Sequence, residues 1–204
     1  MLSQVKDRER VRNYGEVFTN PREVDAMLDL VADEAVAIDS TFMEPACGNG
    51  NFLIEILHRK LNSAFCLAQR NDADCEYLAT RAFASIYGVD IQMDNVIEAR
   101  NRLFDHFFVR FINHFKHKPS KICTDSVQFI LSQNIQCGNT LTCQTAEGNP
   151  LYITQWYFDY NNGLTICIYD YKEMVDTGCN CKPLHTLPRI PYLLLPAIVQ
   201  RKSI

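Results

Sequence analysis

The sequence lacks the long apolar segments of membrane and secreted proteins. None of its apolar runs approaches the roughly 20 residues that cross a bilayer. Residues 1–8, MLSQVKDR, hold no apolar stretch of the kind found in a secretory signal. We therefore expect a cytoplasmic protein without a membrane segment.

Paired cysteines at the spacing of a zinc site are also missing. Seven of the nine cysteines stand singly, and Cys179 and Cys181 form a Cys-x-Cys without a second pair. Several lie in apolar segments, where a free thiol behaves as a small hydrophobic side chain. The pattern predicts reduced cysteines and no bound metal.

A basic excess is the third absence. The net charge is −4, whereas proteins that grip DNA unaided neutralise many phosphates with Lys and Arg. Positive charge is local, in residues 6–12, 100–110 and 201–202. We expect any contact with DNA to be weak or assisted by a recognition subunit or further domain.

What the chain does contain is an alternation of strand and helix patterns. Residues 20–38 begin with Asn-Pro, a cap followed by proline at the first helical position. Phenylalanines in the helix expected at 94–118 have the spacing of a core-facing stripe. The alternation is typical of a doubly wound α/β fold with a mostly parallel sheet. The strand candidates are 40–44, 86–91 and 135–141, and the other helix candidates are 52–61, 71–84 and 125–133.

The pattern changes near Pro150. Residues 151–158 and 164–169 are rich in aromatic and β-branched residues and flank Asn-Asn-Gly, which predicts an antiparallel hairpin. The tail beyond it carries four prolines and is expected to form neither a regular helix nor a central strand. We accordingly divide the chain into an N-terminal helical segment, an α/β core, and a hairpin with a proline-rich tail. The three parts span residues 1–40, 41–142 and 143–204.

The most informative segment is residues 42–53, FMEPACGNGNFL, which follows an apolar strand and opens a helix. Gly48 and Gly50 lack the Cβ atoms that would hold the backbone away from a ligand. Glu44 ends the strand, and open α/β sheets bind ligands beyond the carboxyl ends of their strands. Its carboxylate would suit a cationic amino group. The turn lacks the Gly-Lys-Ser/Thr of a phosphate-binding loop, so we do not expect it to bind a nucleoside triphosphate. The alternative to a ligand-binding turn is a strand-to-helix turn that binds nothing.

A second acid, Asp90, ends the next strand. In such folds this residue accepts hydrogen bonds from ribose hydroxyls, and Ile91 would then lie against an adenine ring. The alternative is that Asp90 caps the helix that follows.

Together these segments resemble the cofactor motifs of adenine-N6 DNA methyltransferases, in the group whose cofactor motifs precede the catalytic one. Residues 14–21 (YGEVFTNP) resemble the motif that folds against the methionine end of the cofactor, and 44–53 resemble the cofactor loop. Residues 88–91 (GVDI) resemble the ribose motif, and 137–141 (CGNTL) the strand end that meets the adenine amino group.

The resemblance covers residues 14–142 and implies a Rossmann-like methyltransferase fold with S-adenosylmethionine as the cofactor and no metal. The implied activity is methylation of adenine in DNA, within a restriction-modification or mobile-element system. The residues expected to bind the cofactor are Phe18, Thr19, Glu44, Pro45, Ala46, Gly48, Gly50, Asn51, Phe52, Asp90, Ile91 and Asn139.

The catalytic motif of that family, Asn/Asp-Pro-Pro-Tyr/Phe, is not intact in this chain. The nearest match, residues 149–152 (NPLY), makes Asn149, Pro150 and Tyr152 the candidate catalytic residues. The preceding residues, 144–148, read as a polar turn, so the alternative is a plain hairpin or strand entry. Little chain remains beyond residue 141 for a target-recognition region.

Three functions therefore stay open at this stage. The first is a DNA adenine methyltransferase, complete, shortened, or split with a companion methylase chain. The second is a non-catalytic module that binds the cofactor or a methylase partner. The third is methylation of RNA or of a protein glutamine, since related folds use similar proline motifs.

Overall fold

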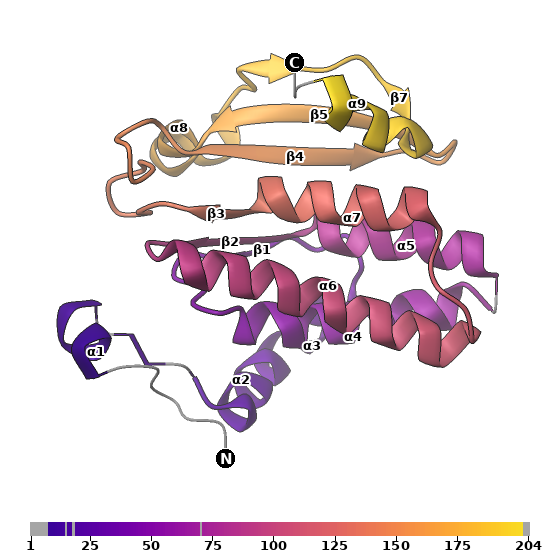
Figure 1. Ribbon diagram of the computed structural model, residues 1–204. Coiled ribbons are helices and arrows are strands. Elements are labelled where there is room, and N and C mark those ends of the chain that lie inside the picture. The colour runs from indigo at the N-terminus through magenta and orange to yellow at the C-terminus, as the bar shows by residue number, and fades with distance from the viewer. Residues whose placement is uncertain (1–7, 15, 18, 70, 202–204) are drawn as a thin grey trace.

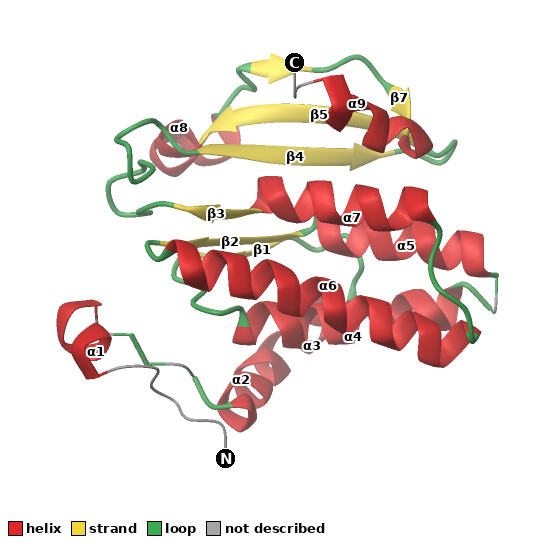
Figure 2. Ribbon diagram, in the orientation of Figure 1, coloured by secondary structure: helices red, strands yellow, loops and turns green. Residues whose placement is uncertain are grey.

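The computed structural model describes residues 8–14, 16–17, 19–69 and 71–201. It is an α/β structure in stacked layers (Figure 1). Helices α4 (Asn51–Leu67) and α6 (Met93–Phe115) cover one face of a parallel sheet, and a second, antiparallel sheet lies on the opposite side. Figure 2 shows the same layers by element type.

The strands and helices follow the expected alternation as far as β5. The strands are β1 (Phe42–Glu44), β2 (Ile86–Asp90), β3 (Ile135–Cys137), β4 (Tyr152–Phe158), β5 (Gly163–Asp170), β6 (His185–Thr186) and β7 (Ile190–Pro191). The helices are α1 (Arg8–Tyr14), α2 (Pro21–Leu28), α3 (Ala32–Val36), α4 (Asn51–Leu67), α5 (Asp72–Ala84), α6 (Met93–Phe115), α7 (Lys121–Asn134), α8 (Tyr171–Thr177) and α9 (Leu195–Arg201).

The parallel sheet has the order β1-β2-β3. Glu44 pairs with Gly88, and Asp90 pairs with Cys137. The three strands run in the same direction, so their carboxyl ends meet at one edge. The third strand ends at Cys137, earlier than expected, because Asn139 begins a turn: its backbone pairs with Gln144 and its side chain accepts from Leu141 N.

Helix α6 confirms the interpretation of the phenylalanine stripe as core. Leu103, Phe107 and Phe111 are completely buried. Helix α7 begins earlier than expected, because the Ser120 side chain accepts a hydrogen bond from Cys123 N and caps it.

The second sheet is built around the predicted hairpin, with β4 and β5 paired from Tyr152↔Asp170 to Phe158↔Leu164. Its contact with the first sheet is polar as well as apolar. The Tyr87 hydroxyl donates to the Thr154 carbonyl at 3.0 Å. Just before β3, at the end of α7, Asn134 Oδ1 accepts from Trp156 Nε1 at 2.9 Å. Buried residues of both sheets belong to one apolar cluster.

The expectation for the tail was wrong in one respect. It contains α9, a short helix with Pro196 at its second position. Proline is tolerated in the first turn of a helix, because the backbone N–H groups there have no intrahelical partner. The tail strands β6 and β7 are two residues each and pair with β5 at different places. Among the described residues, no helix combines the length and apolar character that a membrane crossing requires.

Candidate functional site

A cavity of about 590 Å³ opens at the carboxyl ends of β1 and β2. Its wall is formed by the N-terminal segment, the turn between β1 and α4, the residues after β2 and the residues after β3. The predicted cofactor residues that line it are Thr19, Glu44, Pro45, Ala46, Gly48, Asn51, Phe52, Asp90, Ile91 and Asn139. Phe18 lies outside the described residues.

Gly50, which was also predicted to bind the cofactor, packs against helix α6. It is buried, adopts φ +88°, and is not one of the residues that line the cavity. A Cβ atom at this position would lie 3.1 Å from the Cβ of Ala99 on α6. The missing side chain therefore makes room for a helix, while Gly48, with φ +52°, faces the cavity.

Glu44 ends β1 and is half-buried on the cavity wall. Burial raises the pKa of its carboxyl above the ordinary value, and a hydrogen bond from the Ala46 backbone opposes the shift. A cationic group beside this carboxylate would lower its pKa again. The residue thus favours a positively charged neighbour.

Asp90 is buried and already accepts three hydrogen bonds. Oδ2 accepts from Gly48 N at 2.9 Å, and Oδ1 accepts from Gln92 N at 2.8 Å and from Asn95 Nδ2 at 3.2 Å. The carboxylate thereby ties the glycine turn to the start of α6. Asp90 is not the N-cap of α6, because that position belongs to Gln92. It organises the turn and lines the cavity.

Asn139 is similarly engaged. Its side-chain oxygen accepts from Leu141 N at 2.9 Å and from Thr142 N at 3.3 Å. An amide oxygen has two lone pairs, and both are used by this turn. The next residue, Thr140, donates from its hydroxyl to the Pro45 carbonyl at 3.2 Å and joins the loop after β3 to the glycine turn.

Sequence reasoning missed several lining residues, of which Glu16 is the most important. Its side chain is 8% exposed, and Oε2 accepts from Arg10 Nη2 at 2.6 Å and from Asn95 Nδ2 at 2.7 Å. The other oxygen, Oε1, is buried without a hydrogen-bond partner among the described residues. Its place inside the segment 14–21 was a signal, but one of its two partners, Asn95, lies 79 residues away in the sequence. The others are Val17, Cys47, Asn49, Gln92, Thr140 and Leu141.

Cys47 is not a nucleophile in this cavity. Burial raises the pKa of its thiol to about 12, with the charges of Asp90 and Glu44 adding to the shift. The thiol is therefore protonated at neutral pH, and only a thiolate is strongly nucleophilic.

The charges on the cavity wall are of one sign. Glu16, Glu44 and Asp90 contribute carboxylates, and no Lys, Arg or His stands among the described lining residues. Such a wall attracts cations and repels phosphates. Among the described residues there is also no group of three or more His, Cys, Asp or Glu side chains that could hold a metal ion.

The candidate catalytic residues lie elsewhere. Asn149, Pro150 and Tyr152 are exposed, and none is among the residues that line the cavity. The Asn149 carbonyl accepts from Thr145 N at 2.8 Å in the turn before β4. Asn149 and Pro150 thus lie in the turn before β4, and Tyr152 is the first residue of that strand. A catalytic role for them stays a prediction.

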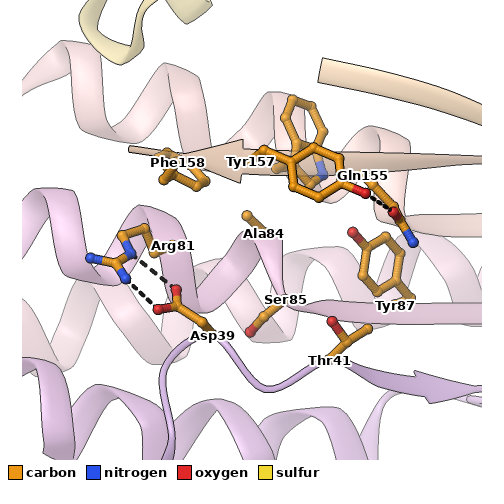
Figure 3. Close-up of a pocket in the computed structure, with 10 residues that line it drawn as sticks. Asp39, Thr41, Arg81, Ala84, Ser85, Tyr87, Gln155, Tyr157 and Phe158 are labelled. Atoms are coloured by element: carbon orange, nitrogen blue, oxygen red, sulfur yellow. Dashed lines mark hydrogen bonds and ion pairs between the residues drawn. The ribbon is translucent and has the colours of Figure 1, made fainter. Parts of the chain in front are cut away.

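A smaller cavity of about 350 Å³ lies between β4 and the residues that precede β1 and β2 (Figure 3). Arg81 and Asp39 form an ion pair on one side, and the Tyr157 hydroxyl donates to Gln155 Oε1 on the other. These polar groups are paired with one another by hydrogen bonds, and no predicted site residue that the structure describes lines this cavity. A third, more open cavity of about 660 Å³ lies between α3, α4 and α5 and is likewise lined by no predicted site residue. The candidate functional site is therefore the cavity at the carboxyl ends of β1 and β2, called the larger cavity here in contrast to the one in Figure 3.

Comparison of the chain with protein-family models, with curated proteins and with solved structures finds no match. The function has to be inferred from the residues that line the larger cavity.

Proposed function

We propose that this chain binds S-adenosylmethionine in the larger cavity and serves as the cofactor-binding unit of a DNA adenine-N6 methyltransferase. One observation carries the proposal: three carboxylates and no described basic side chain line a cavity at the carboxyl ends of parallel strands. At neutral pH S-adenosylmethionine carries a sulfonium and an ammonium against a single carboxylate. When bound, it supplies an activated methyl group.

The residues present fit this ligand. Glu44 suits the ammonium group, and the carboxylates of Asp90 and Glu16 suit the ribose end. Ile91 is 46% exposed while lining the cavity, and an adenine ring would cover it. Helix α4 begins at the cavity without a side-chain cap, and the N–H groups of a helix's first turn favour a carboxylate.

The same proposal extends to the fold. We infer that the sheet β1-β2-β3 is the cofactor-binding half of a doubly wound, Rossmann-like sheet. The parallel order and the ligand-sized cavity beyond the carboxyl ends support this inference. DNA would then be bound with a recognition subunit or a companion methylase chain, as the net charge of −4 implies.

A second candidate function is a non-catalytic module that binds the cofactor or a partner methylase. The position of Asn149, Pro150 and Tyr152 outside the lining of the cavity favours it. Both candidates require the same ligand, so cofactor binding is the first experiment.

Isothermal titration calorimetry of S-adenosylmethionine tests the proposal. Glu44→Gln should weaken binding by about 1–3 kcal/mol, the contribution of a hydrogen bond to a charged group. The matched control is Glu23→Gln, which removes the same charge from an exposed position on α2 and should leave the affinity unchanged. ATP, which carries phosphates, should bind far more weakly. Equal affinity for ATP, or no heat with S-adenosylmethionine, would overturn the proposal.

A further inference from the structure

Glu16 lines the larger cavity, and one oxygen of its carboxylate is buried there without a hydrogen-bond partner among the described residues. The carboxylate is more than nine-tenths buried, and this oxygen is Oε1. Burying an acceptor without a donor costs about 1–3 kcal/mol, and more for a charged group. Oε1 is covered by protein atoms, so a ligand that brings a donor would reach it once the Glu16 carboxylate turns toward the cavity.

Asp90 by itself does not have enough acceptor sites for a ribose. A carboxylate offers about four lone-pair sites, and three hydrogen bonds from Gly48, Gln92 and Asn95 already reach this one. A ribose presents two hydroxyl donors next to each other. The second hydroxyl therefore needs an acceptor from another residue of the wall.

Asn95 holds Glu16 beside Asp90. Its side-chain nitrogen, Nδ2, donates to Glu16 Oε2 at 2.7 Å and to Asp90 Oδ1 at 3.2 Å. Asn95 is almost completely buried, so both carboxylates are positioned by one fixed amide. Two neighbouring carboxylates match two neighbouring hydroxyls.

Arg10 reduces the electrostatic repulsion between the carboxylates of Glu16 and Asp90. It binds Glu16 Oε2 at 2.6 Å and Asp94 Oδ2 at 2.6 Å, and these hydrogen bonds raise the pKa of its own guanidinium. The ion pair with Asp94 also joins α1 to the start of α6. The positive charge of Arg10 offsets the repulsion between the two acids.

We propose that Glu16 accepts a hydrogen bond from one ribose hydroxyl and, with Asp90, makes the site selective for ribonucleosides over deoxyribonucleosides. This inference rests on the proposed function, because it assumes that a nucleoside occupies the cavity. Glu16 is then a specificity-determining residue contributed by the N-terminal segment.

The test measures discrimination and not activity. S-Adenosylmethionine and its 2′-deoxy and 3′-deoxy analogues are titrated calorimetrically into the wild-type chain, Glu16→Gln and Glu16→Asp. Wild type should bind at least one deoxy analogue about tenfold to a hundredfold more weakly, the scale of a charge-assisted hydrogen bond. Both variants should lower that ratio to about threefold or less. Glu16→Asp retains a carboxylate that can pair with Arg10, so it controls for the case in which Glu16→Gln fails to fold.

Arg10→Met separates recognition from docking of the segment. It removes the ion pair but keeps the Glu16 carboxylate, and should preserve the discrimination ratio even if overall affinity falls. An equal loss of the ratio in Arg10→Met overturns the inference, as does an unchanged ratio in both Glu16 variants. In either case wild-type binding of S-adenosylmethionine would leave the proposed function standing. No binding by wild type overturns both.

Discussion

At the residue scale, the turn between β1 and α4 shows how a missing side chain can serve packing instead of ligand binding. Gly48 and Gly50 were expected to have the same role, yet only Gly48 lines the cavity. Gly50 adopts a left-handed backbone conformation against Ala99 of α6. The close approach of α6 keeps its first turn, with Asn95, next to the acids of the cavity.

Gly50→Ala should therefore destabilise the fold by about 1–3 kcal/mol, because it adds strain at positive φ to a tight contact. Chemical denaturation with urea measures this. Gly148→Ala is the matched control: its φ is +81°, but a Cβ there meets nothing within 4 Å, so it reports backbone strain alone. Equal losses in the two variants would mean that the contact with Ala99 has no effect.

At the scale of elements, α6 joins the cavity to the interior. Its first turn carries Asn95, and its middle packs on α4, where His106 lies next to His58 with ring centroids 5.4 Å apart. Arg110 donates to the His58 carbonyl at 2.9 Å in the same cluster. Burial, followed by the charges of Arg110 and His58, lowers the pKa of His106 to about 4. The contact between α4 and α6 therefore favours the neutral form of the His106 imidazole.

Acidification should weaken this contact. In the unfolded chain His106 takes up a proton near pH 6.5, whereas in the folded protein it does so only near pH 4. Between these values the unfolded state binds more protons, so the free energy of unfolding should fall as the pH falls from 6.5 to 4.

His106→Gln should flatten that part of the curve, measured by urea unfolding at a series of pH values. A slope in this window identical to that of the wild type would rule out His106 as its source.

At the scale of the whole molecule, the antiparallel sheet lies over the parallel one through Tyr87, Asn134 and Gln136, whose side chains hydrogen-bond to β4. This packing places the start of β4 over β3, where Gln136 donates to the Tyr152 carbonyl (Figure 1). Residues 149–152 are therefore held as a strand entry, away from the lining of the cavity.

This arrangement leads to a prediction about turnover. A tritiated-methyl transfer assay with the chain alone should show no incorporation into mixed-sequence DNA, RNA or a glutamine-containing protein, because residues 149–152 do not line the cavity. Incorporation that Asn149→Ala abolishes would contradict this expectation and restore the turn as the catalytic motif. Incorporation unaffected by Asn149→Ala would instead point to other catalytic residues.

Local pattern by itself determined the order of elements as far as the hairpin, the core stripe of α6 and the position of the glycine turn. These depend on spacing, capping and turn chemistry within a few residues. The strand-end rule for parallel sheets also predicted that Glu44 and Asp90 would line one cavity, and the resemblance of residues 14–21 to a cofactor motif added Thr19. Neither reveals what these residues bind.

Only the tertiary structure decided how these acids are used. Arg10 and Asp94 are 84 residues apart in the sequence, and Asn95 and Glu16 are 79 apart. No local periodicity encodes such partners. Packing of distant segments gives Asp90 its three hydrogen bonds and leaves one oxygen of Glu16 without a partner among the described residues. It also places residues 149–152 at the entry to β4 instead of on the cavity wall. Hydrogen-bond saturation and burial are properties of the assembled fold, because they depend on which distant segments meet.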